Sequence, residues 1–222
     1  HGVAHPSQGN YIAMIAGSTM GVRDDRIYNL NGSHLGDLLE AKGLDWRVYA
    51  EDYPMGGCFP GGGKNTYVRK HNPFISFVNV QTNASRCQTH IVNSNQFMND
   101  VRDHKLPEYS LYVPGLRSDG HDTGVNYASQ WLERTFGSLL ADPSFLRGTL
   151  FVVTFDESEL FRDRTGNLIY TVVLGEGIQP GTESSREYNH ISMLRTIEEI
   201  FATGNLGRQD ASSEPIHELL GK

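Results

Sequence analysis

The chain has 222 residues, of which 38% are hydrophobic, and its 19 Lys and Arg against 26 Asp and Glu give a formal net charge of −7. A nucleic-acid surface needs excess basic residues to neutralise phosphates, so this balance argues against nucleic acid as a partner. No apolar run approaches the roughly 20 residues that a membrane-spanning helix requires. The length allows one well-buried core, and we expect residues 1–222 to form a single domain.

Apolar periodicity and turn residues predict alternating helices and strands. In chain order they predict a helix over residues 10–16, a helix over 34–42, a strand over 46–49, a glycine-rich loop over 52–66, a helix over 94–104, a strand over 109–113, a helix over 125–140, strands over 149–154 and 168–174, a helix over 190–201 and an irregular tail over 208–222. Ser33 is the expected N-cap of the second helix, and Gly17 and Gly43 are the expected stops of the first two. This alternation predicts an α/β layered domain with a mostly parallel sheet.

Two adjacent acidic residues, Asp156 and Glu157, follow the apolar strand at 149–154. Open α/β sheets bind ligands at the carboxyl ends of their strands. Neighbouring carboxylates repel each other, and a metal ion often offsets that repulsion. The alternative for such a pair is a solvated loop after a strand.

Ser7 directly precedes the first predicted helix. A helix N-terminus presents unpaired N–H groups and a partial positive charge, which favours phosphate binding and helps to activate a nucleophile. The alternative is that Ser7 only caps the helix.

Two histidines also lie at element boundaries. His121, followed by Asp122, comes after the strand at 109–113, and His190 opens the last predicted helix. Histidine titrates near neutrality and can donate a proton to a leaving group. His121 could equally be a surface residue of a polar loop. The helix dipole disfavours a charged His190, so a neutral acceptor or ligand suits that position better.

The cysteines and the N-glycosylation patterns indicate the cellular compartment in which the protein folds. Cys58 and Cys87 could close a loop that stabilises the fold by roughly 3–4 kcal/mol if oxidised. Asn31 and Asn83 each begin an Asn-x-Ser acceptor pattern for N-glycosylation. Such patterns also arise by chance, and the two thiols could be free. Together they favour a secreted, extracellular protein with a Cys58–Cys87 disulfide.

Six stretches of the sequence carry a family resemblance. They are HPSQGNYIAMIAGS from His5, DLLEAKGLDWRVYAEDYP from Asp37, YVRKHNPF from Tyr67, LYVPGLRSDGHDTG from Leu111, TLFVVTFDES from Thr149 and YNHISMLRTIEEIF from Tyr188. In this order they resemble the phosphoesterase family that contains bacterial phospholipases C and bacterial and fungal acid phosphatases, within the alkaline-phosphatase-like superfamily. The resemblance implies an alkaline-phosphatase-like three-layer α/β sandwich and hydrolysis of a small phosphate ester through a phosphoserine intermediate.

The resemblance also implies roles for individual residues. Ser7 matches the family's hydroxyl nucleophile, which also binds the metal, and Asp156 and Glu157 match its acidic metal ligands. The implied cofactor is one divalent cation, for which calcium, zinc and magnesium are the alternatives.

Four further residues are expected to belong to the site. His121 and His190 match catalytic histidines of the family, and Asn10 and Asp122 are the expected substrate-binding residues. Gly9 stands where the family more often has proline, a change that we expect to alter loop stiffness rather than chemistry.

The sequence departs from the family pattern at its front. The family usually begins with a strand ending in Glu-Asn, which completes the metal site, and this sequence starts after that point. We expect either a domain truncated at its N-terminal edge and completed by a separate N-terminal fragment of the same precursor, or a chain that has lost the pair. The second case would give a catalytically silent relative that binds an anion, a glycan or a partner. A phospholipase C ranks lower, because no amphipathic basic helix suited to a bilayer surface is evident.

Overall fold

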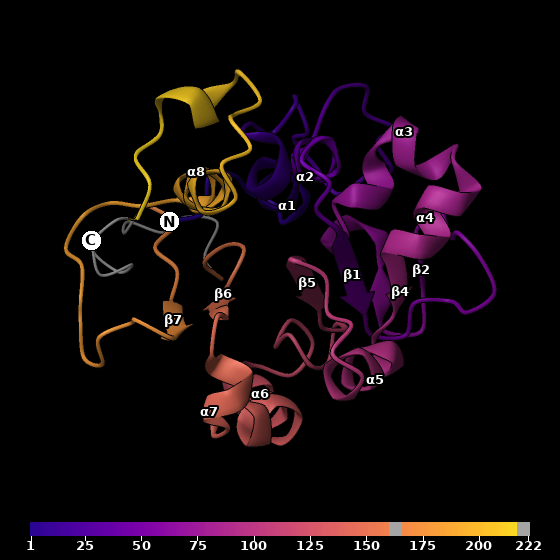
Figure 1. The fold of residues 1–222 in the computed structure, drawn as a ribbon. Coiled ribbons are helices and arrows are strands. Elements are labelled where there is room, and N and C mark those ends of the chain that lie inside the picture. Colours follow the sequence, from indigo (N-terminus) through magenta and orange to yellow (C-terminus); the bar gives the residue numbers. More distant parts are fainter. Residues whose placement is uncertain (160–165, 217–222) are drawn as a thin grey trace.

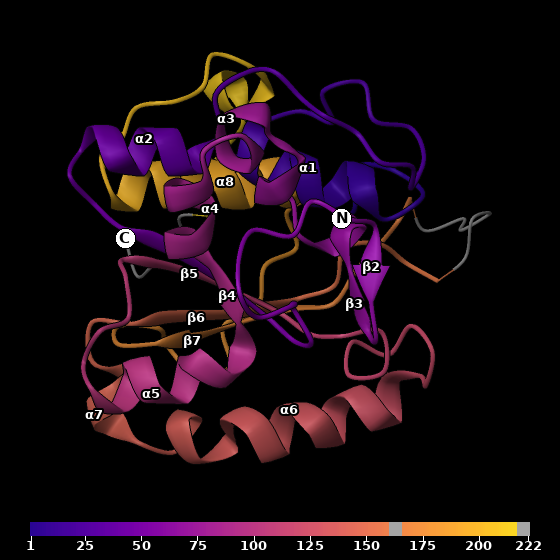
Figure 2. The same ribbon diagram turned by 90° about the vertical axis from the view of Figure 1, so that its right-hand side faces the viewer.

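Figures 1 and 2 show the computed structural model of the chain, which describes residues 1–159 and 166–216. Strands form a middle layer between two layers of helices (Figure 2). On one side lie α1 (Gln8–Ala16), α2 (Leu35–Ala41) and α8 (His190–Ile200), and on the other lie α5 (Phe97–Arg102), α6 (Val125–Leu140) and α7 (Pro143–Leu146). This arrangement confirms the expected three-layer α/β sandwich.

Among the described residues, the central sheet is parallel and has three strands, in the order β4 (Ile91–Asn93), β1 (Trp46–Ala50) and β5 (Tyr109–Val113). Val48 in β1 pairs with Ile91 on one side and with Leu111 on the other. Four of the five residues of β1 are buried, because helices cover both faces of the sheet. The sequence predicted β1 and β5 but not the three-residue β4.

A second pair of strands lies beyond β5, on the side away from β1 (Figure 1). In it, β6 (Leu150–Thr154) runs antiparallel to β7 (Thr171–Gly175). The strand that precedes the acidic pair is therefore not hydrogen-bonded into the parallel sheet among the described residues. The prediction started this strand three residues early, because Leu168, Ile169 and Tyr170 extend its apolar run, although the side chains of Leu168 and Tyr170 are exposed.

The main core fills the space between the parallel sheet and the layer of α1, α2 and α8. Ile12 and Ile15 of α1, Leu194 of α8 and Trp46 and Val48 of β1 are fully buried there. Burial of each such aliphatic side chain contributes about 1.5–3 kcal/mol. This packing fixes the start of α1 relative to the strands.

A smaller aromatic cluster lies on the opposite face and connects the two strand systems. The ring of Phe136 in α6 lies 5.0 Å from that of Tyr112 in β5 and 5.4 Å from that of Phe151 in β6. Thus α6 holds β6 beside the parallel sheet through side-chain packing.

The ends of the first two helices follow from local hydrogen bonds. Gly17 ends α1 with φ of 67°, as predicted, and a Cβ there would lie 2.3 Å from Asp210 Oδ1. The N-cap of α2 is His34 rather than the predicted Ser33. His34 Nδ1 accepts the Gly36 N–H at 3.1 Å, and the His34 N–H donates to Asp37 Oδ2 at 2.8 Å. The His34 side chain is fully buried, and its ring lies against the first turn of α2.

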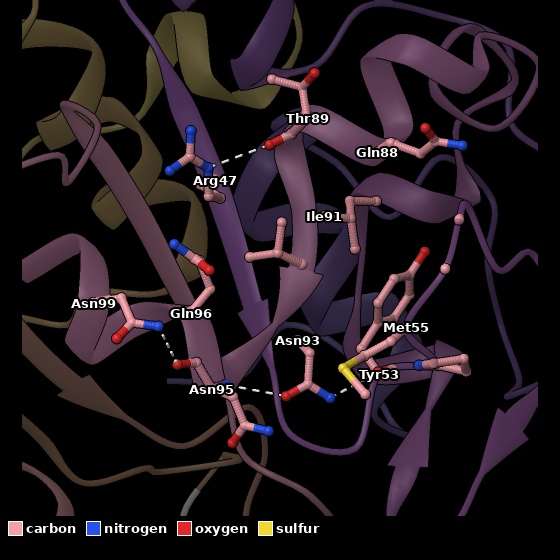
Figure 3. A pocket seen from close by; sticks show the side chains of 14 residues that line it. Arg47, Tyr53, Met55, Gln88, Thr89, Ile91, Asn93, Asn95, Gln96 and Asn99 are labelled. Carbon is pink, nitrogen blue, oxygen red and sulfur yellow. Dashed lines mark hydrogen bonds between the residues drawn. The ribbon is translucent and has the colours of Figure 1, made fainter.

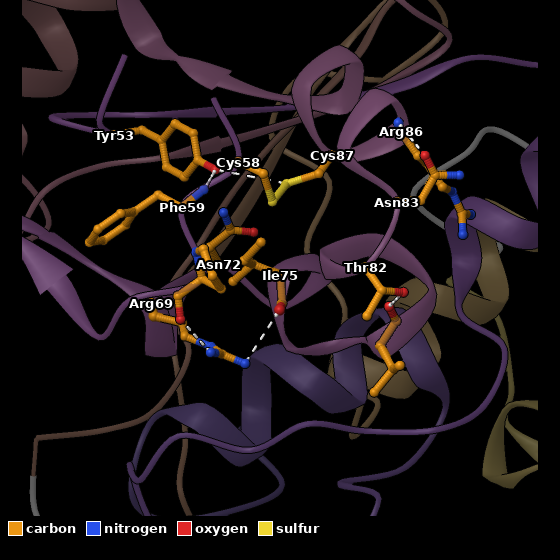
Figure 4. The surroundings of a disulfide bond; sticks show 12 residues. Tyr53, Cys58, Phe59, Arg69, Asn72, Ile75, Thr82, Asn83, Arg86 and Cys87 are labelled. Carbon is orange, nitrogen blue, oxygen red and sulfur yellow. Dashed lines mark hydrogen bonds between the residues drawn. A yellow bond between two sulfur atoms is a disulfide. The ribbon is translucent and has the colours of Figure 1, made fainter. Parts of the chain in front are cut away.

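The glycine-rich stretch has more order than a loop. It ends in a short antiparallel ribbon of β2 (Gly63–Lys64) and β3 (Tyr67–Val68). Cys58 forms the predicted disulfide with Cys87 of α4 (Ala84–His90), with a Cα–Cα distance of 5.5 Å (Figure 4).

Short helical elements complete the described chain. They are η1 (Arg69–His71), η2 (Phe74–Ser76), α3 (Val78–Gln81), η3 (Ser94–Gln96) and η4 (Gln209–Ser212). The predicted helix at 94–104 is thus split between η3 and α5, and η4 lies within the stretch predicted to be irregular. Across residues 1–159 and 166–216, no helix is long and apolar enough to cross a bilayer.

Candidate active site

Ser7 lies at the start of α1 with its side chain turned to the acidic pair. The residue has helical backbone angles and is only 5% exposed. Its hydroxyl donates to Glu157 Oε1 at 2.9 Å, while Asp25 accepts the first N–H of the helix, from Gln8, at 3.0 Å. The alternative that Ser7 merely caps α1 is therefore wrong.

Asn10 holds the segment that leads to Ser7. Its side-chain oxygen accepts the N–H groups of Val3 and Ala4 at 2.7 and 2.9 Å, and its amide donates to the Ala4 carbonyl at 2.9 Å. The residue is fully buried. These contacts are internal, and the predicted contact of Asn10 with substrate stays a prediction.

The acidic pair is not a solvated loop. Glu157 lies between Ser7 and His5, whose Nδ1 donates to Glu157 Oε2. Asp156 Oδ2 is buried and lacks a hydrogen-bond partner among the described residues. Glu157 thus accepts a hydrogen bond from the Ser7 hydroxyl, and Asp156 keeps one buried acceptor oxygen without a partner among the described residues.

His190 contacts the backbone of the acidic pair Asp156 and Glu157. It is 3% exposed, and its Nε2 donates to the main-chain oxygen of Asp156 at 2.6 Å. Burial lowers the pKa of His190, so the ring is neutral, as its place at the start of α8 favours. The observed contact fixes the backbone at the acids. A catalytic role for His190 stays a prediction.

Tyr11 has a pKa that reflects its burial and the negative charge of the nearby carboxylates. It lies one helical turn after Ser7 on α1. Desolvation raises the pKa of its phenol well above the ordinary value, and the charges of Asp156, Asp119 and Glu157 raise it further. The carboxylates of two distant loops therefore converge around one face of α1.

The predicted pair His121 and Asp122 lies in a more exposed loop. The two side chains are about half exposed, and His121 Nδ1 is 2.7 Å from Asp122 Oδ1. The His121 ring lies 6.3 Å from the ring of His71, which stacks on Tyr11 with 4.9 Å between centroids. This places His121 near the helix that carries Ser7.

Sequence reasoning missed four residues of this arrangement, namely His5, Tyr11, His71 and Asp119. Two of them had a local signal, because His5 stands two residues before Ser7 and Asp119 two residues before His121. Tyr11 is in the same helical face as Ser7, four residues on, and His71 is in the stretch YVRKHNPF.

The donor set fits part of a cation site. Asp156, Glu157 and Ser7 supply oxygen donors of the kind that hard cations prefer. However, both Glu157 oxygens are engaged by Ser7 and His5. Within the described ranges, no group of three or more His, Cys, Asp or Glu side chains is arranged to hold a metal ion. The residues described would hold a cation only together with further ligands.

A cavity of about 670 Å³ lies away from these residues, beside β4 and α5 (Figure 3). Arg47 in its lining donates to Asp100 at 2.7 Å, so that charge is already paired. The other polar lining side chains include the amides of Gln88, Asn93, Asn95, Gln96 and Asn99. The cavity contains none of the predicted site residues and offers little positive field for phosphate.

The model of the Phosphoesterase family matches residues 1–203. The chain belongs to this family. It is 36% identical, over 95% of its length, to a probable acid phosphatase of Kluyveromyces lactis and 33% identical, over 95%, to an acid phosphatase of Aspergillus niger, of each of which 52% is covered. It is also 31% identical, over 98% of its length, to a phosphatidylinositol-3-phosphatase of Mycobacterium tuberculosis, of which 69% is covered. The chain thus spans about half the length of the fungal relatives.

Proposed function

We propose that this chain carries the nucleophile of a phosphoric ester hydrolase of the acid phosphatase type. The observation that supports this most directly is the 2.9 Å hydrogen bond from Ser7 to Glu157 at the N-terminus of α1. It joins a hydroxyl, a carboxylate that can accept its proton, and a helix end that favours phosphate. The names of the relatives, acid phosphatase and phosphatidylinositol-3-phosphatase, support the same class of reaction.

In the proposed reaction, Ser7 Oγ attacks the phosphorus of a small phosphate ester in line with the leaving oxygen. Its proton passes to Glu157 as the Oγ–P bond forms and the P–O ester bond breaks. His121 hydrogen-bonds the phosphoryl group or gives a proton to the leaving oxygen. Water then hydrolyses phospho-Ser7, and as the Oγ–P bond breaks Ser7 Oγ takes back the proton from Glu157 and phosphate is released. His190 keeps the acid loop in place through its bond to Asp156.

One divalent cation, calcium, zinc or magnesium, is part of this proposal. When bound, it would neutralise charge on the phosphoryl oxygens. Asp156, Glu157 and Ser7 would hold it in part, and the buried, unpartnered Oδ2 of Asp156 supports a ligand at that point.

The missing ligands would come from a further strand, which we propose is a separate N-terminal fragment of the same precursor. In the described chain, β5 pairs only with β1 and β6 only with β7, so each leaves one edge open. Every residue of β6 is only partly buried although its sequence is apolar. An added strand could pair with these open edges. Native mass spectrometry of the purified protein tests this by looking for a second polypeptide.

The experiment for the function compares Ser7→Ala with the wild-type chain in hydrolysis of p-nitrophenyl phosphate, with and without each cation. We expect Ser7→Ala to lose turnover completely and acid-quenched wild-type protein to carry one phosphoryl group on Ser7. Ser138→Ala, on the exposed face of α6, is the matched control and should keep full activity. Full cation-dependent turnover by Ser7→Ala would refute the proposal.

The second candidate is a catalytically silent family member that binds an anion, a glycan or a partner. The incomplete cation site in the described residues favours it. Calorimetric titration with inorganic phosphate and with each cation separates the two. Phosphate binding without turnover, even with a cation and any associated fragment present, would support the silent protein.

We also propose that the protein is secreted. The Cys58–Cys87 disulfide fits an oxidising compartment, and Asn31 and Asn83 are exposed, as glycan acceptors must be. A loss of mass after glycosidase treatment of the native protein would test both acceptor positions.

A further inference from the structure

His71 is a buried titratable side chain that the reaction above does not use. It lies in η1 and is only 4% exposed. Neither ring nitrogen has a hydrogen-bond partner in residues 1–159 and 166–216. A buried polar group without hydrogen bonds lowers the stability of the fold and is rare. The neighbours of His71 therefore indicate its role.

One neighbour is Tyr11 on the nucleophile helix. The two rings are stacked, with centroids 4.9 Å apart and an angle of 18° between their planes. Because Tyr11 follows Ser7 by one helical turn, the stack ties η1 to the part of α1 that presents the nucleophile.

The other neighbour is Asp119 in the loop before α6. His71 Nδ1 lies 3.3 Å from Asp119 Oδ2, which is within ion-pair distance although the angles do not meet those of a hydrogen bond. The other oxygen of this carboxylate, Oδ1, accepts the backbone N–H of His121 at 2.8 Å. Asp119 therefore stands between the buried ring of His71 and the backbone of the exposed His121.

We infer that His71 is a positioning residue, which through Asp119 fixes the loop 119–122 and so sets where His121 lies relative to Ser7. The inference rests on the proposed function. His71 itself touches no reacting atom. It forms the buried support between α1 and the loop, through its stack on Tyr11 and its contact with Asp119.

The test compares His71→Gln and Asp119→Asn with a matched control, His90→Gln. His90 is also a partly buried histidine that stacks on an aromatic ring, Trp46, at 4.3 Å and faces a carboxylate, but it lies away from the site. The first readout is hydrogen exchange of the His121 amide, which does not depend on turnover. We expect faster exchange in His71→Gln and Asp119→Asn and no change in His90→Gln.

The second readout is steady-state kinetics with p-nitrophenyl phosphate. We expect His71→Gln to lower kcat about 10–100-fold with little change in KM, as for other supporting residues. Combined with His121→Ala, it should add little further loss, because both changes remove the same interaction.

Unchanged His121 exchange in His71→Gln, or fully additive kinetic losses, would overturn the inference. If the wild-type chain does not turn over, the proposed function fails, and the positioning role in catalysis fails with it. The exchange measurement would then still show whether His71 holds the loop. If His71→Gln does not fold, His71→Asn, whose amide nitrogen can stand in for Nδ1 facing Asp119, is measured in its place.

Discussion

The parallel sheet β4–β1–β5 and the antiparallel pair β6–β7 belong to the same layer but differ in burial. β1 is almost entirely buried between helices, whereas all five residues of β6 are only partly buried. The nucleophile helix packs on the well-buried sheet, and the acids extend from the less buried pair. The candidate site is thus assembled between a firmly packed half and a loosely packed half, joined by the Ser7–Glu157 hydrogen bond.

The largest expected effect comes from breaking that junction. Glu157→Gln keeps the size of the side chain but removes the charge that polarises Ser7 and pairs with His5. We expect turnover of p-nitrophenyl phosphate to fall on the order of 10²–10⁴-fold, as when a general base is lost. Glu159→Gln, at an exposed position two residues on, is the control. A kcat near the wild-type value in Glu157→Gln would show that Glu157 does not accept the Ser7 proton.

Loss of the Cys58–Cys87 disulfide tests the firmly packed half. A double Cys→Ala change should lower the free energy of unfolding by roughly 3–4 kcal/mol, since it frees a long loop in the unfolded chain. Urea unfolding of the variant, and of wild-type protein with and without reductant, measures this. Equal stability in all three would show that the bond contributes little.

Two valines at the middle of their strands compare the halves directly. Val48 in β1 is fully buried and Val152 in β6 is only partly buried. We expect Val48→Ala to cost about 2–3 kcal/mol and Val152→Ala about 1 kcal/mol, in proportion to the apolar area and packing removed. Urea midpoints with unchanged m-values are the measurement. A larger loss of unfolding free energy in Val152→Ala than in Val48→Ala would contradict the assignment of β6 to the loosely packed half.

The last prediction concerns the pH dependence of stability and the carboxyl-terminal end of α8. Burial, with the nearby Asp210 charge, raises the pKa of Glu198 to about 8 from an ordinary 4.5, and Arg195 lies 3.7 Å away. The folded state then binds a proton that the unfolded state has lost. Stability is therefore fully present below pH 4.5 and falls as pH rises towards 8.

Thermal unfolding across this pH window checks the Glu198 prediction. The melting temperature of the wild-type protein should fall by a few degrees more than that of Glu198→Gln, which has no proton to lose. Parallel curves for the two proteins would show that Glu198 does not titrate in this range.

Much of the fold and part of the site could be predicted from local patterns. Ser7 and Glu157 are 150 residues apart in sequence, yet both stand at ends of regular elements, and this shared placement is what makes their meeting predictable from the sequence. The pairing of β6 could not be predicted, because an apolar strand does not encode the direction of its neighbour. His71 could not be predicted either, because its importance comes from tertiary contacts with Tyr11 and Asp119.

The open edges of β5 and β6 have a practical consequence for handling the protein. An apolar strand with unpaired N–H and C=O groups readily recruits a strand from another molecule. The β6 edge is therefore the part of the described chain from which we expect concentration-dependent self-association to start, and dilute samples should be the better behaved ones.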